Sequence, residues 1–432
     1  MPTVGYLSLG CFKNLVDTET FLAELQAAGF KVTESPDKVD ALVINTCGFI
    51  EPAKQESVDE ILEAAAEKKA GRVKVLAVVG CLVELNQQEL AKEIPEVDLW
   101  LPLSKINRLP KELAARFGQQ KPRPKREPRL ITTPRHFSYL KIAEGCDHAC
   151  AFCTIPRIRG PYRSRPIAEL VKEAQFLEEA GARELNLIAQ DITYYGRDLS
   201  PQSSLADLLK ALLAETTLPW LRLLYGHPEH LDERVIELLA TEDRLCGYLD
   251  LPLQHISTKI LRAMGRKMGG EETRKLIQRL RREIPGLALR TTMLVGFPGE
   301  TEEDFRELLD FVTEARFEHL GAFAFSPQEL TPAAAMEERV PEEVAEDRLE
   351  ELRERQRGVV EELNQARVGK VETVLVDEVI EDLEFKALGR AGWQAQEVDS
   401  VVWLRGDFKQ GEFVTARIVG ELEYDLIAEK KI

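Results

Sequence analysis

The sequence has no apolar run that approaches the ~20 residues of a membrane-spanning helix. It also lacks a basic start followed by an apolar core, since residues 1–5 (MPTVG) lead directly into a strand-like stretch. We therefore expect no signal peptide, no membrane contact and a cytoplasmic protein. The chain has 432 residues, 44% hydrophobic and 30% charged. It is long enough for roughly two to four globular domains.

Basic residues are outnumbered: 57 Lys or Arg against 74 Asp or Glu give a net charge of −17 and a pI near 5.1. A surface this negative repels polyphosphate, and binding of bare nucleic acid would need a local basic patch. The charge therefore favours a basic partner.

Cysteine is scarce, with seven residues in the chain. Without an export signal these thiols are expected to stay reduced. Their spacing therefore indicates metal ligation or catalysis rather than disulfide bonds.

The first hundred residues alternate between short β-rich apolar runs and helical patterns. Strands are predicted at residues 4–9, 41–45 and 74–79, and helices at 14–28, 53–69 and 86–94. Alternating βα units imply an α/β domain with a mostly parallel, doubly wound sheet.

Residues 118–135 interrupt this alternation with four prolines and six Lys or Arg, which is typical of an interdomain linker. A small basic contact surface is the alternative. From residue 137 to about 326 the alternation resumes. Strands are predicted at 138–143, 184–189, 220–225, 248–251, 287–295 and 319–325, with helices such as 167–180, 205–215, 232–240 and 302–315 between them. Six strands with crossover helices predict a partial (β/α)6 barrel, short of the full eight.

The C-terminal part begins with a charge-laced helical pattern at residues 341–366, which predicts a connecting helix on a solvated face. Short strands are then predicted at 372–377, 400–404, 412–419 and 424–428, as a small all-β barrel. Residues 370–432 hold fourteen Asp or Glu and eight Lys or Arg, a net charge of −6. An RNA-tracking barrel should be basic, so this one suits a basic protein loop, unless it is only an acidic solvated surface.

The strongest local signal is the CxxxCxxC spacing of Cys146, Cys150 and Cys153, just past the first predicted barrel strand. Cubane iron–sulfur clusters normally take four thiolates, so three leave one iron free to bind a small molecule. Zinc with His148 as a fourth ligand is the alternative. Structural zinc sites usually pair two separated ligand groups, however, and no second group lies nearby in the sequence.

A second set of thiols consists of Cys11, Cys47 and Cys81, which each follow the carboxyl end of a predicted βα strand. Ligand sites in open parallel sheets form at this edge, so the three thiols can converge on a second cluster with an open iron. Taken singly, each could be a small core hydrophobe. We expect that structural role for Cys246, which matches neither set.

Polar residues also follow several barrel strands, where barrel enzymes place their sites. They are Gln190, Asp191, His227, Gln254, His255 and the run from Gly296 to Glu300 (GFPGE). Each alone could be a satisfied structural polar group, but their shared placement at strand ends favours a binding site.

Together these motifs resemble the radical S-adenosylmethionine (SAM) superfamily. The upstream three-cysteine domain and the downstream small barrel narrow the resemblance to the methylthiotransferases. Three runs are similar to RimO, the ribosomal-protein branch: LGCFKNLVD at 9–17, QDITYYG at 190–196 and PLQH at 252–255. One departure is Phe12, where that branch commonly has proline, and we expect it to alter only local turn geometry.

The resemblance implies a methylthiotransferase domain over residues 1–117, a linker over 118–136, a radical SAM barrel with its connecting helix over 137–367 and a TRAM domain over 368–432. It implies methylthiolation of the β-carbon of an aspartate on ribosomal small-subunit protein twelve. Those hydrogens have no accessible pKa, so cofactors rather than side chains would supply the chemistry, and no side chain is assigned as catalytic.

The implied cofactors are two [4Fe-4S] clusters, with SAM as both radical source and methyl donor. Candidate SAM-binding residues are Gln190, Asp191, Gln254, Gly296 and Glu300. An electron donor and a sulfur source are further expected partners, and nucleic acid is expected only within the ribosome.

Two alternatives remain open. The first keeps the chemistry but modifies an adenosine in tRNA, and the acidic C-terminal barrel and the run at residues 9–17 argue against it. The second is a non-catalytic iron–sulfur or zinc-binding scaffold, which leaves the polar strand ends of the barrel unexplained.

Overall fold

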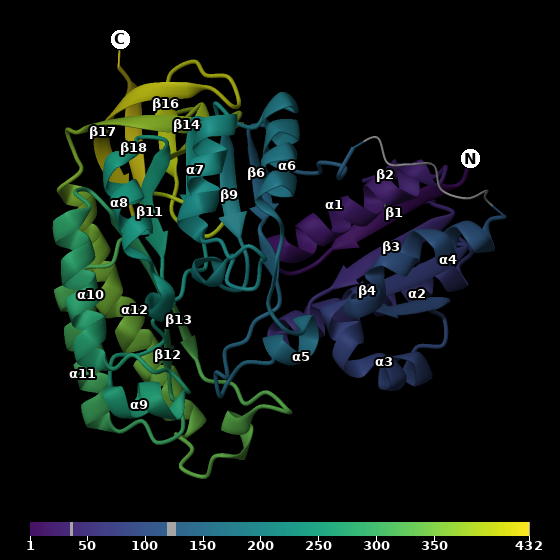
Figure 1. The fold of residues 1–432 in the computed structure, drawn as a ribbon, viewed down its shortest axis with the longest axis horizontal. Coiled ribbons are helices and arrows are strands. Elements are labelled where there is room, and N and C mark those ends of the chain that lie inside the picture. The colour runs from purple at the N-terminus through teal and green to yellow at the C-terminus, as the bar shows by residue number, and fades with distance from the viewer. Residues whose placement is uncertain (35–37, 119–126, 432) are drawn as a thin grey trace.

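The computed structural model describes residues 1–34, 38–118 and 127–431. No helix within these residues is both long and apolar enough to cross a membrane. A five-stranded sheet, a six-stranded sheet and a closed five-stranded barrel follow one another along the chain (Figure 1).

The N-terminal sheet is parallel, with strand order β2-β1-β3-β4-β5. Its elements are β1 (Thr3–Ser8), α1 (Phe12–Ala27), β2 (Lys31–Thr33), β3 (Ala41–Thr46), α2 (Glu51–Lys69), β4 (Val75–Gly80), α3 (Cys81–Glu93) and β5 (Leu99–Pro102), followed by η1 (Leu103–Arg108) and α4 (Leu109–Arg116). The three predicted βα units are confirmed. The edge strands β2 and β5 escape the sequence pattern because they are too short to show apolar periodicity.

The second sheet is also parallel, and its strands lie in chain order from β6 to β13. They are β6 (Phe137–Lys141), β9 (Glu184–Ile188), β10 (Trp220–Leu223), β11 (Leu245–Asp250), β12 (Ala288–Val295) and β13 (His319–Ala324). The helices between them include α6 (Ile167–Glu179), α7 (Leu205–Glu215), α8 (Glu233–Thr241), α9 (Thr258–Ala263), α10 (Gly270–Glu283) and α11 (Glu302–Ala315). The predicted partial barrel of six strands is confirmed, and its edges β6 and β13 stay open.

The connecting helix α12 (Glu342–Gln365) differs from the expectation of a solvated face. Ala345, Leu352 and Val359 are buried, and the helix lies against α11 and β13. Most charged residues of α12 lie at its outward positions and hide the apolar stripe in the sequence, although Arg348 is buried with that stripe.

The C-terminal barrel closes in the order β14-β15-β16-β18-β17. Its strands are β14 (Val371–Val379), β15 (Ala387–Ala391), β16 (Val402–Arg405), β17 (Phe413–Leu422) and β18 (Asp425–Lys430). β15 escapes the sequence pattern because Gly389 and Arg390 break its apolar alternation.

A buried charge cluster joins this barrel to the six-stranded sheet. Glu184 accepts hydrogen bonds from Arg222 at 2.7 Å and from Arg390 of β15 at 2.6 Å. Burial alone would raise the pKa of Glu184, but the two guanidinium groups outweigh it and lower that pKa to about 2. The C-terminal barrel is thus fixed to the amino end of β9, away from the carboxyl strand ends.

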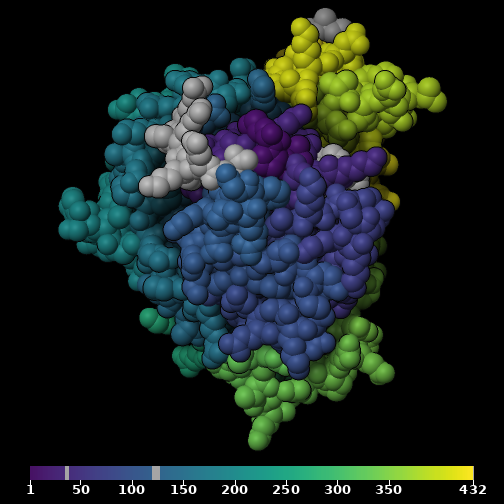
Figure 2. Space-filling model, turned by 90° about the vertical axis from the view of Figure 1, so that its right-hand side faces the viewer, coloured from purple at the N-terminus to yellow at the C-terminus, as the bar shows by residue number. Residues whose placement is uncertain are grey.

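The N-terminal domain packs against the open edge of the six-stranded sheet, where α1 lies against β6. Figure 2 shows its purple and blue surface in front of the teal barrel. In the predicted linker, residues 119–126 lie outside the described residues. Arg129, just beyond them, is buried between Glu19 and Glu173, so this end of the linker packs as part of the domain contact.

Candidate functional site

Three thiols meet at the carboxyl edge of the N-terminal sheet. Cys11 precedes α1 after β1, Cys47 directly follows β3, and Cys81 opens α3 after β4. The parallel register of β3 with both β1 and β4 keeps these strand ends level. Gly10 has a φ of 86°, and a Cβ there would lie 2.7 Å from the Cβ of Cys47. Only glycine fits this close approach.

The other three thiols lie on the loop between β7 (Ala143–Glu144) and α5 (Ile155–Arg159). Cys153 donates its backbone N–H to the carbonyl of Cys150 at 3.1 Å, which folds the CxxxCxxC loop back on itself. Gly145 enters the loop with a φ of 82°, and a Cβ there would lie 2.1 Å from the carbonyl oxygen of Pro161. The loop can therefore follow this backbone path only with glycine at position 145.

All six thiols line one cavity of about 370 Å³ between the N-terminal domain and the barrel. The other lining residues are Lys13, Asn14, Phe49, His148, Phe152, Ile155, Ile158, Arg159, Gln190, Tyr225, Gly226, His227, Pro252, Gln254 and Arg266. Cys246 lies apart, buried in β11 among apolar side chains. The two cysteine sets that the sequence separates are therefore brought face to face by the domain contact.

Two of the five candidate SAM-binding residues line this cavity, Gln190 and Gln254. The side-chain oxygen of Gln190 is buried and has no hydrogen-bond partner among the described residues. Gln254 has a φ of 72°, and its cavity neighbour Tyr225 has a φ of 64°. Left-handed backbone at non-glycine residues is strained and concentrates at functional sites.

The other three candidates, Asp191, Gly296 and Glu300, do not line this cavity. Gly296 packs under α12, where an added Cβ would lie 2.5 Å from the Cβ of Ala345. Glu300 is buried and accepts a hydrogen bond from Arg348 at 2.8 Å. Through these two residues, the loop after β12 packs against α12. Asp191 is also buried, behind the histidines of the cavity wall.

Asp191 holds two imidazoles in place. One carboxylate oxygen lies 2.8 Å from Nε2 of His148 and 3.0 Å from Nδ1 of His230. The other accepts hydrogen bonds from the backbone N–H and the hydroxyl of Thr193. Burial opposes the charge, but these hydrogen bonds keep the pKa of Asp191 below its usual range. Nδ1 of His255, another polar candidate, accepts a hydrogen bond from the backbone N–H of Ser257 at 3.0 Å.

Three histidines beside the thiols are poorly arranged to hold a metal ion of their own. Ligand atoms of His148, His227 and His230 lie within 4.8 Å of one another. However, the rings of His148 and His227 stack with 13° between their planes, so their lone pairs run side by side instead of converging. Nε2 of His227 also faces Arg266 at 2.5 Å, where a metal ion would have to sit beside a guanidinium.

A network of charged side chains contacts one of the thiols, Cys81. Arg159 is buried and pairs with Asp17 at 3.2 Å and with Glu144 at 2.8 Å. The same guanidinium lies 3.6 Å from Sγ of Cys81 and donates to Asn14. Because Arg159 belongs to the barrel and Cys81 to the N-terminal domain, one side chain positions both halves of the site.

Two further cations line the cavity, Lys13 and Arg266. Lys13 is buried, and burial lowers its pKa, which the neighbouring Cys11 partly offsets. Arg266 lies beside Cys150. The cavity between the thiols is therefore walled by positive charge as well as by apolar side chains.

Burial raises the pKa of Cys47, Cys81, Cys146, Cys150 and Cys153 and so favours their protonated forms. Burial raises the pKa of Cys81 and of Cys153 to about 12, and that of Cys146 to about 11. Such thiols are unreactive as nucleophiles at neutral pH. Metal binding would replace their protons, because only thiolates ligate iron.

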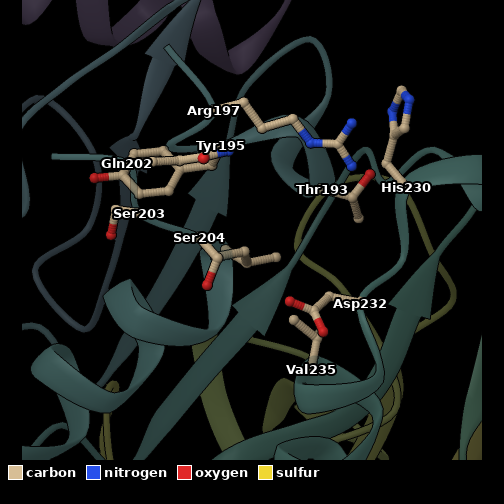
Figure 3. Close-up of a pocket in the computed structure, with 10 residues that line it drawn as sticks. Thr193, Tyr195, Arg197, Gln202, Ser203, Ser204, His230, Asp232 and Val235 are labelled. Atoms are coloured by element: carbon tan, nitrogen blue, oxygen red, sulfur yellow. The ribbon is translucent and has the colours of Figure 1, made fainter. Parts of the chain in front are cut away.

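A second, smaller cavity of about 190 Å³ is shown in Figure 3. It is lined by Thr193, Tyr195, Arg197, Gln202, Ser203, Ser204, Leu205, His230, Asp232 and Val235. None of these lining residues is a cysteine or one of the residues predicted to bind SAM. The chemistry-bearing side chains gather in the larger cavity.

Several site residues carry no signal in the sequence. Arg159, Arg266 and Tyr225 reach the cavity only through tertiary packing. Lys13 and Asn14 lie in the run after Cys11, where only their proximity to a predicted ligand could have marked them. Phe12 of the same run stacks on Tyr139 of β6, with ring centroids 4.3 Å apart. The unusual residue thus contributes to the domain contact.

Comparison with known proteins assigns the three parts of the chain to families. Residues 3–102 match Uncharacterized protein family UPF0004, residues 140–312 match the Radical SAM superfamily, and residues 368–430 match the TRAM domain. "Ribosomal protein uS12 methylthiotransferase RimO" from Trichlorobacter lovleyi is 44% identical, over 99% of this chain and 97% of the relative. The protein of the same name from Aquifex aeolicus is 43% identical, over 98% and 96%.

Among solved structures, the chain is similar to the radical S-adenosylmethionine methyltransferase TsrM from Kitasatospora setae, which was solved with cobalamin and a [4Fe-4S] cluster bound. The TM-score is 0.55 at 18% identity, over 77% of this chain and 76% of that one. At this identity the likeness shows a shared fold.

Proposed function

The chain belongs to the RimO family of ribosomal protein uS12 methylthiotransferases, and we propose that it methylthiolates the β-carbon of an aspartate on uS12. It is a radical SAM enzyme by its central domain. The observation that carries the proposal is the single cavity lined by two sets of three thiols. A methylthio transfer needs a radical source and a sulfur source to reach the same carbon, and one cavity between two cysteine sets meets that need.

The cavity fits the cofactors that this reaction requires. Each cysteine set offers three thiolates, which suits a cubane cluster with one iron left open. The buried side-chain oxygen of Gln190, which has no hydrogen-bond partner within the described part of the chain, would accept a hydrogen bond from a polar group of SAM. When bound, two [4Fe-4S] clusters and SAM supply radical chemistry that no side chain can provide at a carbon without an accessible pKa.

We assign the two cysteine sets different tasks. Cys146, Cys150 and Cys153 lie beside Gln190 and Gln254 on the barrel wall, so this set would hold the cluster that binds SAM. Cys11, Cys47 and Cys81 would hold the cluster that carries the sulfur. Other residues of the chain would bind and orient the reactants and exclude water. Arg159 and Asn14 position the second cysteine set, and apolar side chains such as Phe49 and Phe152 line the cavity.

The remaining parts of the proposal concern organisation and partners. We propose functional units at residues 1–117, 137–367 and 368–432, joined by the linker at 118–136. The C-terminal unit, with its net charge of −6, would attract a basic loop of the ribosomal protein. An electron donor and a source of sulfur are required as further partners.

Mass spectrometry of uS12 tests the proposal. Reconstituted protein, SAM, sulfide and a reductant are incubated with uS12 without oxygen, and a gain of one methylthio group on an aspartate is expected. Cys47→Ala and Cys150→Ala should each abolish the gain. Cys246→Ala is the matched control, because this thiol is buried outside the cavity. Unmodified uS12 together with methylthiolated tRNA would contradict the proposal.

A further inference from the structure

A lysine in the wall between the two cysteine sets forms no ion pair with any of the described residues. Lys13 lies in the first turn of α1, two residues after Cys11, and only 8% of it is exposed. Its Nζ lies 3.4 Å from the carbonyl oxygen of Ala189 and 3.4 Å from the centre of the Tyr225 ring. The ammonium therefore sits at the cavity wall, between the N-terminal domain and the carboxyl ends of β9 and β10.

Two neighbouring cations, Lys141 and Arg159, are paired with carboxylates, whereas Lys13 is not paired with any carboxylate that the structure describes. Lys141 and Arg159 share the carboxylates of Asp17 and Glu144. Within the described ranges of the chain, no ion pair is formed by Lys13. An ammonium has three donors, and here one long hydrogen bond and an aromatic face meet only part of that capacity. Burial of a charge without a partner costs free energy. The position of Lys13 in a binding cavity therefore indicates that a ligand supplies its counter-charge.

We propose that Lys13 binds the carboxylate of the side chain to be modified, and thereby selects an acidic residue as the substrate. This inference rests on the proposed function. The β-carbon of aspartate is bonded directly to its carboxylate carbon. A cation that fixes the carboxylate therefore holds the reacting carbon within about one bond length, ~1.5 Å, of the fixed group. Lys13 is two residues from Cys11 and lines the same cavity, so the recognition point belongs to the side of the cavity that carries the cysteine set assigned to sulfur.

A competing role for Lys13 is to balance the charge of the thiolates beside it. Arg159 already approaches Cys81 at 3.6 Å, so the second cysteine set has a cation of its own. The two roles predict different behaviour. A charge-balancing lysine would affect cluster content, whereas a recognition lysine would affect the preference for aspartate over its neutral isostere.

Arg266 provides a matched control. It is the other cavity-lining cation for which the described residues supply no carboxylate, and it lies across the cavity beside Cys150. If recognition depends on Lys13, the loss of Arg266 should leave the preference for aspartate intact. If Arg266 were the recognition residue, the pattern would reverse.

The test measures binding of uS12 and of a uS12 variant in which asparagine replaces the target aspartate. Reconstituted enzyme is titrated anaerobically with each protein, with SAM but without reductant, so that no turnover occurs. The native enzyme should prefer aspartate roughly 10- to 100-fold, the worth of a charge-assisted hydrogen bond. Lys13→Met should reduce this ratio to about 2-fold or less, and Arg266→Met should preserve it. Iron content is measured for every variant.

Each result decides the question. A native enzyme that binds both uS12 proteins equally overturns the inference without any variant. So does a Lys13→Met enzyme that keeps the native ratio, or an Arg266→Met enzyme that loses it. If Lys13→Met does not assemble its clusters, Lys13→Gln and Lys13→Arg replace it, and only the arginine variant should keep the preference. An enzyme that methylthiolates uS12 but fails these comparisons leaves the proposed function standing, whereas one that does not modify uS12 refutes the proposed function first.

Discussion

Replacement of Gly10 by alanine should remove one cluster and spare the other. Gly10 precedes Cys11 and contacts Cys47, so it serves only the N-terminal cysteine set. The Cys146, Cys150 and Cys153 set lies on a separate loop. A substitution that disturbs one set through a defined contact therefore tests whether the two sets work as separate metal sites.

The size of the disturbance follows from the backbone. At a φ of 86° an alanine carries the left-handed penalty of about 1–2 kcal/mol. Its Cβ would also lie 2.7 Å from the Cβ of Cys47 and 2.9 Å from its Sγ, against 3.4 Å for ordinary contact. The Cβ of Cys47 must therefore retreat by the difference, about 0.7 Å. Functional ligands tolerate displacements of only about 0.5 Å, so the thiolate should no longer hold iron.

The assay is iron content per chain after anaerobic reconstitution. The native protein should hold about eight irons in two cubane clusters, and Gly10→Ala about four. Gly71→Ala is the matched control: its φ of 76° carries the same penalty, and nothing lies within 4 Å of an added Cβ. A Gly10→Ala protein with the native iron content, or a Gly71→Ala protein with the same loss, would refute the reasoning.

Three further predictions concern the supports of the site. Gly145→Ala should remove the other cluster, measured as lost reductive cleavage of SAM, because its Cβ would lie 2.1 Å from the Pro161 carbonyl. Arg159→Met should lower the free energy of unfolding by about 3 kcal/mol, measured by urea titration, since it leaves buried carboxylates underpaired. Glu184→Gln should be destabilising at neutral pH. Because the folded-state pKa of Glu184 is lowered from 4.5 to about 2, the stability difference from the native protein should disappear as the pH falls through that window.

The fold was largely predictable because its signals are local. Six barrel strands and three βα units show as apolar runs of ordinary length, and the six predicted cluster cysteines all lie in the segments that follow strands. The strands β2 and β5 are not predicted because too few residues carry the pattern, and β15 is not predicted because Gly389 and Arg390 interrupt its apolar alternation. The buried stripe of α12 is missed because the charges around it dominate the sequence.

The site was less predictable, because much of it depends on tertiary contacts. The sequence placed Gln190 and Gln254 at the right strand ends, but it could not show that Glu300 is taken by Arg348. Nor could it show that Arg159 reaches across to Cys81, or that Lys13 has no carboxylate beside it among the described residues. Pairing between distant residues is a property of the packed chain, and a single sequence does not display it.

The central claim is that the two cysteine sets hold separate clusters that act on one substrate. The most direct measurement compares two triple variants, one with Cys11, Cys47 and Cys81 and one with Cys146, Cys150 and Cys153 replaced by alanine. Each should keep about four irons. Only the first should still cleave SAM when reduced, and neither should methylthiolate uS12. A triple variant that loses all its iron, or one that still methylthiolates uS12, would contradict the account.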